Sequence, residues 1–342
     1  MKDTGAVEAA IEFRDVVKRY GTATAVAGIS LTIRKGELVT FLGPSGCGKT
    51  TSLRLIAGLE LPSEGQVLIA GRDVSRDPAS ARNVGMVFQS YALFPHMSVL
   101  DNVAYGPVIR GASRAQAQAK AREILDQVGL AGLHARLPAE LSGGQQQRVA
   151  VARAIVQQPD VILFDEPLSN VDAKLRRKVR EEIRSLQRRF GLTAVYVTHD
   201  QEEALAVSDR IVVMDRGRIA QVGTPQDLYD RPASAFIADF IGDANLIRGT
   251  VAGGVLAAGP LRLAVPGPDG PATLSIRPER VGLVPGEGGE IVTATYLGSR
   301  MEYLVRSGEI DVLVSRPIGE PRLAAGDAVA LRIDAADLRR VE

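Results

Sequence analysis

Apolar residues in the first part of the chain follow strand patterns. Residues 7–42 show short alternating runs separated by turns, and the last of these runs, Glu37–Leu42, leads into a glycine-rich loop. Further on, Val161–Phe164 is apolar without interruption, which is typical of a strand buried in a parallel sheet. The other strands predicted in this part are Val84–Phe88, Thr193–Thr198 and Arg210–Asp215.

Helical periodicity separates these strands. It predominates over residues 98–157, including the alanine-rich run Ser113–Val128, and returns in Val171–Phe190, where Val179 and Ile183 belong to an apolar stripe. Shorter helices are predicted over Thr50–Gly58 and Gln201–Val207. Because strands alternate with helices, we expect an α/β domain.

Past Gly242 the pattern changes to short strands joined by glycine- and proline-rich connections. The predicted strands there are Thr273–Ile276, Ile291–Tyr296, Glu302–Val305, Ile310–Val314 and Val329–Ile333. This texture predicts a separate all-β domain, a small barrel. We therefore expect one domain over residues 1–242 and a second over 243–342.

Composition describes an ordinary globular protein. The chain has 342 residues, 45% of them hydrophobic and 24% charged, with a formal net charge of +1 that gives no sign of a nucleic-acid partner. No apolar run is long enough to span a membrane, and we find no signal peptide. The single cysteine, Cys47, excludes an internal disulfide and suits a reducing compartment. The expected location is therefore cytoplasmic.

The segment Gly43-Pro-Ser-Gly-Cys-Gly-Lys-Thr50 matches a phosphate-binding loop, G-x-x-x-x-G-K-[ST], between a predicted strand and a predicted helix. Backbone N–H groups of such a loop converge on phosphates, Lys49 adds a positive charge, and the Thr50 hydroxyl is a ligand for Mg²⁺. Cys47 is interpreted as a spacer within the loop.

Two adjacent carboxylates, Asp165 and Glu166, end the apolar strand that begins at Val161. Successive side chains of an extended chain point apart, so the two can divide two tasks. Asp165 can hold Mg²⁺ through water, and Glu166 can act as general base on an attacking water.

The segment Leu-Ser-Gly-Gly-Gln, residues 141–145, opens a predicted helix. Ser142 and Gln145 are spaced as a capping box, which accounts for both residues. Gly143 and Gly144 stay unexplained, because each glycine inside a helix costs up to about 1 kcal/mol relative to alanine.

Together, the phosphate loop, the Leu141–Gln145 segment, Asp165-Glu166 and His199 resemble the ATP-binding cassette (ABC) family along residues 10–240. The resemblance implies a P-loop ATPase fold with a helical subdomain at about residues 90–158, followed by an OB-like domain of the TOBE type. It also implies ATP and Mg²⁺ as cofactors.

Further roles follow from the resemblance alone. Tyr20 is the aromatic residue that stacks on adenine, and Gln89 senses Mg²⁺ and the attacking water. His199 contacts the γ-phosphate, and Asp172 belongs to a loop that crosses a dimer. The nucleotide-binding set is Tyr20, Gly43, Pro44, Ser45, Gly46, Cys47, Gly48, Lys49, Thr50, Thr51, Gln89, Ser142, Gly143, Gly144, Gln145, Asp165, Asp172 and His199. The catalytic residues are Glu166, which is not in this set, and Lys49, Gln89 and His199, which are. The Mg²⁺ ligands are Thr50, Gln89 and, through water, Asp165.

In this family two chains pair head to tail, and the Leu-Ser-Gly-Gly-Gln segment of one caps the ATP held by the other. Bare glycines would let backbone N–H groups reach the γ-phosphate, and a helix N-terminus carries about half a positive charge. The expected partners are therefore a second copy of the chain and, as the segment 89–97 and the β domain suggest by resemblance, the permease subunits of an importer. Such importers are fed by a periplasmic or extracellular solute-binding protein, and their ATPase lies at the cytoplasmic face of the inner membrane.

The solute and one competing class stay open. The stretch 227–246 resembles ferric-iron importers, and polyamine, aminoethylphosphonate, sulfate and sugar importers share much of it. The competing class is a soluble ABC ATPase that acts on nucleic acid or ribosomes. The arginine-rich helix after Asp172 is the main argument for it, but the i,i+4 spacing of Arg177 with Glu181 and of Lys178 with Glu182 favours a solvated face.

Overall fold

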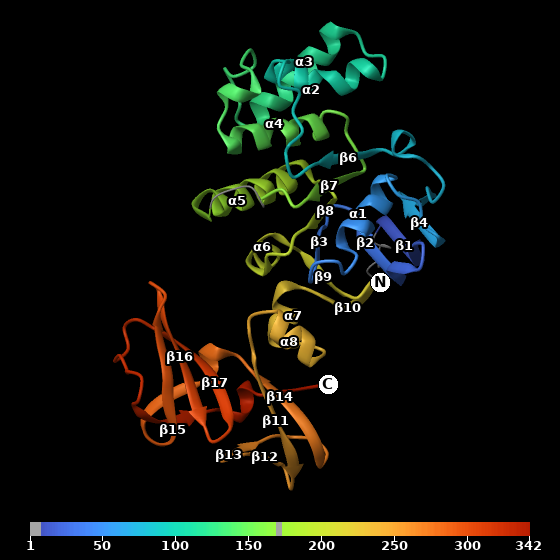
Figure 1. The fold of residues 1–342 in the computed structure, drawn as a ribbon. Helices are drawn as coiled ribbons and strands as arrows, with labels where there is room; N and C mark the ends of the chain where they lie inside the picture. The colour runs from blue at the N-terminus through green and yellow to red at the C-terminus, as the bar shows by residue number, and fades with distance from the viewer. Residues whose placement is uncertain (1–7, 169–172) are drawn as a thin grey trace, which may run out of the picture. The chain divides into compact units, whose positions relative to one another are not determined.

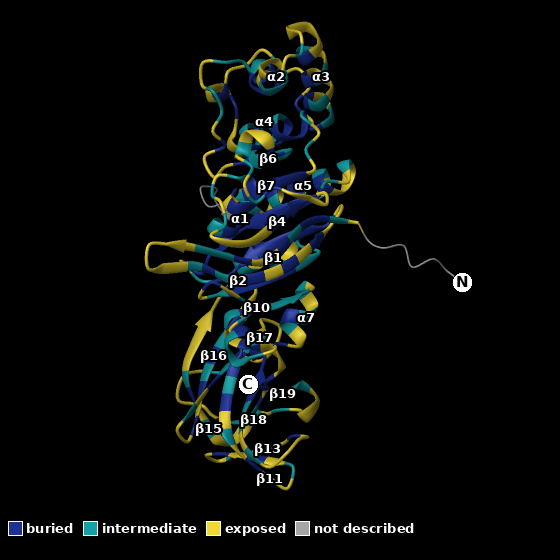
Figure 2. Cartoon of the chain, turned by 90° about the vertical axis from the view of Figure 1, so that its right-hand side faces the viewer, coloured by how far each residue is buried: buried dark blue, intermediate teal, exposed yellow. Residues whose placement is uncertain are grey.

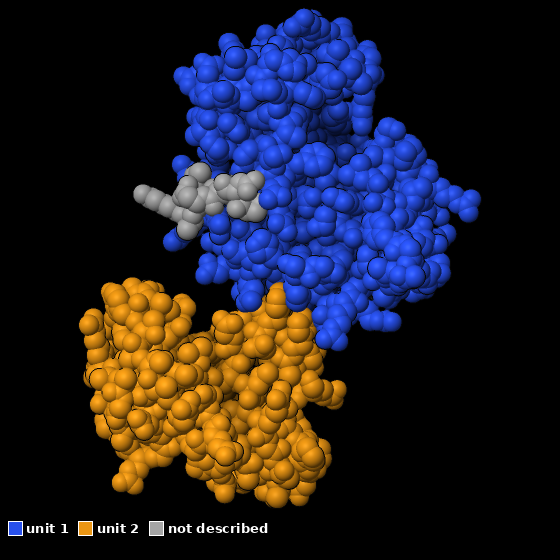
Figure 3. All heavy atoms as spheres, viewed as in Figure 1, with its two compact units in different colours: residues 1–225 blue, residues 226–342 orange. Residues whose placement is uncertain are grey.

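The computed structural model describes residues 8–168 and 173–342, and it divides the chain into two compact units. These are residues 1–225 and 226–342 (Figure 3). The sequence-based boundary at 242/243 differs from this division by the segment 226–242, which packs with the C-terminal unit. There the buried Arg277 side chain donates hydrogen bonds to the carbonyl oxygens of Tyr229, Ala238 and Ile241.

A six-stranded, mainly parallel sheet forms the centre of the N-terminal unit (Figure 1). Its strands, in spatial order, are β10 (Arg218–Gly223), β9 (Arg210–Asp215), β3 (Leu38–Leu42), β8 (Ala194–Val197), β7 (Val161–Asp165) and β6 (Val84–Val87). Only β10 pairs antiparallel to its neighbour. Every residue of β3 and β8 is buried, which explains their continuous apolar sequence.

A second, antiparallel sheet in this unit carries the strands predicted near the N-terminus. Its order is β2 (Ala23–Arg34), β1 (Ala9–Tyr20), β4 (Glu64–Ile69) and β5 (Arg72–Asp73). Alternate residues of β1 and β2, such as Ile11, Phe13, Leu31 and Ile33, are buried in one core cluster with residues of the central sheet. Figure 2 shows this burial along β1 and β4.

Six α-helices and two 3₁₀ helices (Ala79–Ala81 and Pro138–Glu140) complete the described part of the N-terminal unit before residue 225. The α-helices are α1 (Lys49–Ala57), α2 (Val99–Ile109), α3 (Arg114–Gln127), α4 (Gly143–Ile155), α5 (Ala173–Phe190) and α6 (Gln201–Val207). Ser98, Ser113 and Ser142 cap α2, α3 and α4, and each accepts a hydrogen bond from a backbone N–H of its first turn. These three helices gather on one side of the unit around their own apolar cluster (Figure 1). The predicted start of α5 at Val171 lies outside the described residues.

The C-terminal unit is all-β apart from two short α-helices, α7 (Pro225–Asp230, which begins at the division) and α8 (Ala235–Phe240), and two single-turn 3₁₀ helices, Pro278–Arg280 and Ala335–Asp337. One sheet has the order β13 (Leu261–Ala264), β12 (Val255–Ala258), β11 (Asn245–Ala252), β14 (Gly270–Ile276) and β19 (Arg339–Val341). The other has β17 (Ile310–Pro317), β16 (Arg300–Ser307), β15 (Gly282–Tyr296) and β18 (Ala328–Arg332). Both contribute to one apolar core.

Candidate functional site

Four neighbouring parallel strands end beside one another, and a predicted site residue follows or ends each of them. The phosphate loop follows β3, His199 follows β8, Asp165 ends β7, and Gln89 follows β6. The strand register aligns Phe41 with Val197 and Val197 with Asp165. Because the carboxyl ends of parallel strands meet at one edge, the fold brings these predicted residues together, at the position where ligands bind in open α/β sheets.

The phosphate loop has a backbone that only glycine allows at two points. Gly43 (φ +154°) and Gly48 (φ +105°) lie so close to other segments that a Cβ atom would overlap the backbone oxygens of Met214 and Ala25, respectively. Gly48 is the N-cap of α1, and Ser45 and Gly46 are exposed. The loop thus presents backbone N–H groups at a helix N-terminus, the arrangement that binds phosphate.

Lys49 is held inside this loop. Its Nζ donates hydrogen bonds to the carbonyl oxygens of Gly43 (2.7 Å) and Pro44 (2.8 Å), and the residue is only 6% exposed. Cys47, within the loop, is buried, and burial raises the pKa of its thiol although the Lys49 charge acts in the opposite direction. Thr50 and Thr51 follow in the first turn of α1 and are partly exposed.

The two adjacent carboxylates, Asp165 and Glu166, have different surroundings. Burial raises the pKa of Asp165, with Arg54 opposing the shift and Glu166 adding to it. The strand ends at Asp165, and Glu166 turns into the left-handed region at φ +45° while its N–H bonds the Val197 carbonyl at 3.1 Å. This turn brings Glu166 Oε2 to 3.4 Å from Nδ1 of His199, whose side chain is 61% exposed.

The Leu141–Gln145 segment forms the predicted capping box at the start of α4. Ser142 accepts a hydrogen bond from the Gln145 N–H, and the Gln145 side chain accepts one from the Ser142 N–H at 2.9 Å. Gly143 is exposed, and a Cβ atom built on it would meet nothing within 4 Å. The packing of the described chain therefore does not require glycine at position 143.

Two other predicted residues, Tyr20 and Gln89, have simpler surroundings. Tyr20 ends β1 with 45% of its surface exposed, and Lys18 Nζ lies 4.9 Å from its ring centroid. Gln89 is exposed after β6. Asp172 and its role in a crossing loop lie outside the described residues.

Two charged residues beside the site were not predicted from the sequence. Arg54 lies one helical turn after Thr50 on α1, and its positive charge opposes the rise in the pKa of the Asp165 carboxyl. Glu203 of α6 is buried next to the strand that leads to His199. The i,i+4 spacing from Thr50 was a signal for Arg54, but nothing in the sequence indicated that Glu203 is buried.

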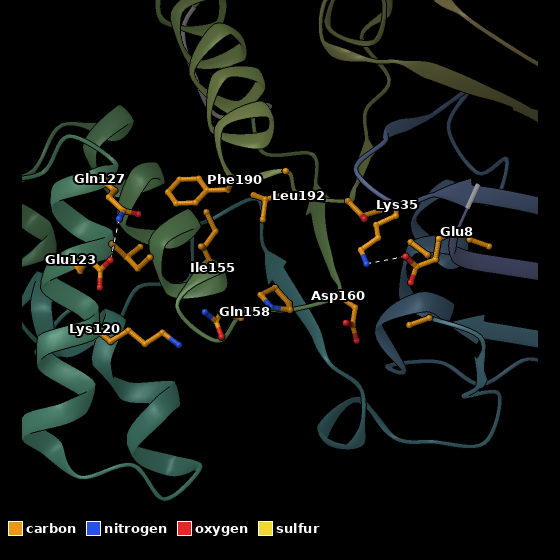
Figure 4. Close-up of a pocket in the computed structure, with 17 residues that line it drawn as sticks. Glu8, Lys35, Lys120, Glu123, Gln127, Ile155, Gln158, Asp160, Phe190 and Leu192 are labelled. Carbon is orange, nitrogen blue, oxygen red and sulfur yellow. Dashed lines mark hydrogen bonds and ion pairs between the residues drawn. The ribbon is translucent and has the colours of Figure 1, made fainter. Parts of the chain in front are cut away.

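A larger hollow lies at another place in the described part of the chain. It has a volume of about 470 Å³ and includes Asp160 and Thr193, which directly precede β7 and β8, so it is at the opposite edge of the sheet. Figure 4 shows Lys120 and Glu123 of α3 on one side and Lys35 on the other. No predicted site residue lines it, and we place the candidate site at the carboxyl edge because the chemistry-bearing side chains are there.

Two negative findings apply to the residues that the structure describes. Within them no cluster of three or more His, Cys, Asp or Glu side chains is arranged to hold a metal ion by itself. Nor does this part of the chain contain a helix with the length and apolarity needed to cross a membrane.

Comparison with known proteins gives matches in both units. The "ABC transporter" family model matches residues 26–169, and the "TOBE domain" model matches residues 274–341. The Fe(3+) ions import ATP-binding protein FbpC 1 of Rhizobium meliloti (strain 1021) is 54% identical over 333 residues, covering 94% of each chain. The FbpC protein of Escherichia coli (strain K12) is 53% identical, covering 80% of this chain and 79% of its own.

Solved structures agree with these matches. The cbiO1 protein from Clostridium perfringens, part of the ABC transporter complex cbiONQ, has a TM-score of 0.61 and 27% identity, covering 66% of this chain and 92% of its own. The dimeric structure of MJ0796, a bacterial ABC transporter cassette, has a TM-score of 0.55 and 32% identity, covering 63% and 98%. The predicted fold class, a P-loop ATPase followed by an all-β, OB-like domain, is confirmed.

Proposed function

This chain belongs to the ABC transporter family, and from that premise we propose that it is the ATP-hydrolysing subunit of an importer for ferric iron. The observation that carries the proposal is the edge where a phosphate loop, a carboxylate pair, a histidine and a glutamine end four adjacent strands. Iron is supported by the printed names of relatives that are more than 50% identical over most of the chain. Polyamine, aminoethylphosphonate, sulfate and sugar are the solutes left as alternatives.

ATP binds, in this proposal, at the N-terminus of α1. The loop residues Gly43–Thr51 surround the phosphates with N–H groups, and Lys49 exchanges its bonds to the Gly43 and Pro44 carbonyls for bonds to phosphate oxygens. The exposed ring of Tyr20 offers a stacking face for adenine, since an aromatic face stacks on any base.

The oxygen donors beside the loop fit Mg²⁺. Thr50 offers a hydroxyl, Gln89 an amide oxygen and Asp165 a carboxylate, and Mg²⁺ prefers oxygen ligands from few protein groups together with substrate phosphates and water. When bound, Mg²⁺ neutralises charge on the transferred phosphoryl group. Thr50 and Asp165 would hold it, Asp165 through water, and Gln89 would orient toward it.

Glu166 is the proposed general base. Its carboxylate takes a proton from the water that attacks the γ-phosphate, so that ADP and phosphate are the products. His199 lies 3.4 Å from Glu166 and contacts the γ-phosphate, while Gln89 orients the attacking water. Lys49 stabilises charge on the phosphate oxygens during transfer.

Each site is completed by the partner chain of a head-to-tail homodimer. The N-terminus of α4 presents Ser142, Gly143, Gly144 and Gln145 to the ATP bound by the other chain, and Asp172 belongs to the crossing loop. A Cβ atom built on Gly143 would meet nothing within 4 Å, so packing within the described chain does not require glycine there. This open space supports the proposed arrangement.

The proposed transporter contains permease subunits that contact the segment 89–97, and a solute-binding protein delivers iron to them on the other side of the membrane. The chain itself lies at the cytoplasmic face. Several arginines of α5 already have acidic partners, among them Arg177 with Glu181 at 3.4 Å and Arg184 with Asp209. This pairing favours a solvated face over a nucleic-acid surface, so no nucleic-acid partner is proposed.

The test compares wild type and Glu166→Gln in cells that lack the chromosomal copy. Wild type should restore uptake of radioactive ferric iron, and Glu166→Gln should not, because loss of a positioned base slows catalysis by about 10²–10⁴-fold. The variant must still bind MgATP. Restored uptake of another solute with no effect on iron would contradict the solute, and full turnover by Glu166→Gln would contradict the general base.

A further inference from the structure

Glu203 is a buried carboxylic acid with no role in the mechanism described so far. It lies on α6, is 4% exposed, and accepts hydrogen bonds from Thr198 Oγ1 (2.7 Å) and from the Tyr196 hydroxyl (3.2 Å). Burial raises the pKa of its carboxyl, with the Asp200 charge acting in the same direction and the two hydroxyl bonds opposing it. An apolar side chain would fill this position without such a desolvation cost.

The hydrogen bonds of Glu203 connect the residues that precede and follow His199 in the chain. Thr198, the preceding residue, donates its hydroxyl hydrogen to Glu203 and accepts a hydrogen bond from the N–H of Asp200, the following residue, at 3.0 Å. Asp200 in turn accepts from the Glu203 N–H at 3.1 Å. The backbone on each side of His199 is therefore fixed to one network, while the His199 ring stays exposed.

Charged groups from two neighbouring elements approach this network. Arg176 of α5 approaches Asp200 at 3.8 Å, and Glu166 at the end of β7 approaches His199. All of them line one small hollow of about 60 Å³ together with Thr198 and Glu203. The Glu203 carboxyl is thus joined by a hydrogen bond to the residue that precedes His199 and lines the same hollow as the His199 and Glu166 side chains.

We propose that Glu203 is a positioning residue for His199, holding the Thr198–Asp200 turn so that the imidazole stays beside Glu166 and the γ-phosphate. This inference rests on the proposed function, since it assigns no task to Glu203 apart from His199. A misplacement of about 1 Å can reduce the rate of a catalysed step by about 100-fold, so a buried anchor of this kind has a measurable effect.

The test compares ATP turnover by purified Glu203→Leu and Glu203→Gln. Leucine has a similar size but no acceptor, so kcat should fall about tenfold to 100-fold, whereas the Kd for a fluorescent ATP analogue should not change. Glutamine keeps an acceptor oxygen for both hydroxyls and should retain most of the turnover. Thr198→Val, which removes the link to the Asp200 N–H, should lower kcat in the same way as Glu203→Leu. The matched control is Glu202→Leu, one residue away and with its side chain 88% exposed, which should leave kcat unchanged.

A double-mutant cycle with His199→Ala separates positioning from general stability. If Glu203 acts through His199, adding Glu203→Leu to His199→Ala should cause no further loss of kcat. Multiplied losses, or equal losses in Glu203→Leu and Glu203→Gln, would overturn the positioning role while leaving the proposed function intact. Full turnover by His199→Ala alone would instead contradict the proposed role of His199, and the Glu203 proposal with it.

Discussion

Two segments of this chain, the phosphate loop and the start of α4, contain glycine for different reasons. In the phosphate loop, Gly43 and Gly48 have left-handed backbone angles and no space for a Cβ atom, because Met214 and Ala25 of the same chain lie against them. At the start of α4, Gly143 has open space around it. The fold of the chain therefore explains glycine in the loop, and we infer that a molecule outside the chain explains it in α4.

The largest effect is expected from combining one lesion in each segment. Lys49→Ala should disable the site built on its own phosphate loop, and Gly144→Asp should disable the site that its α4 completes, because a carboxylate would face the γ-phosphate. Either homodimer should trap no nucleotide with ADP and a γ-phosphate mimic. A mixed dimer places both lesions in one site and leaves the other intact.

The measurement is trapping after equal mixing of differently tagged chains, with subunit exchange shown first. Random pairing makes half of the dimers mixed, so about half a site per dimer should be recovered. No recovery, with exchange demonstrated, would mean that each chain uses its own α4. The inference that a molecule outside the chain explains Gly143 would then be wrong.

The next effect separates the two glycines within a single chain. Gly48→Ala should lower the free energy of unfolding by about 2–6 kcal/mol, since left-handed strain and overpacking add. Gly143→Ala should leave it unchanged or raise it by up to about 1 kcal/mol, because alanine favours a helix. Denaturant unfolding of the two variants measures the difference. Equal destabilisation would show that α4 needs its glycine for folding.

A smaller effect is expected at Tyr20, which like Gly143 is exposed in its own chain. Tyr20→Ala should weaken ATP binding by about 1–3 kcal/mol if the ring stacks on adenine, and Tyr20→Phe should change little because only the ring face is used. Titration with a fluorescent ATP analogue gives both values. Equal losses in the two variants would indicate a hydrogen bond of the hydroxyl instead.

The smallest effect is expected from removing the β unit, because neither glycine segment lies in it. Chains that end at Pro225 and at Gly242 should both bind MgATP with the affinity of the full chain. They should differ in limited proteolysis, since the chain ending at Gly242 keeps Tyr229, Ala238 and Ile241 without the Arg277 side chain that binds their carbonyls. A truncated chain that no longer binds nucleotide would contradict the division into two units.

Local patterns were sufficient for most of the central sheet and its helices. The predicted helix Gln201–Val207 and strand Arg210–Asp215 have the same bounds as α6 and β9, and Ser142 and Gln145 form the predicted capping box. These features depend on contacts between residues near in sequence or on continuous burial, and both produce a recognisable pattern of apolar positions along the chain. The β unit was harder, since β15 spans Gly282–Tyr296 where only its last part was predicted, and β11 was not predicted.

The sequence by itself identified the candidate residues for the chemistry, because a phosphate loop, a strand-ending carboxylate pair and a helix-capping Ser-Gly-Gly-Gln are each recognised by local spacing. Tertiary structure alone decided what surrounds them. It showed that Ala25 leaves no space for a Cβ atom at Gly48 while Gly143 has open space, that the Arg54 charge opposes the rise in the Asp165 pKa, and that Glu203 is buried and bonded to Thr198. Some of these contacts are between residues far apart in the chain, and others depend on which face of a helix is buried. Both are set by strand order and side-chain packing, which no local pattern encodes.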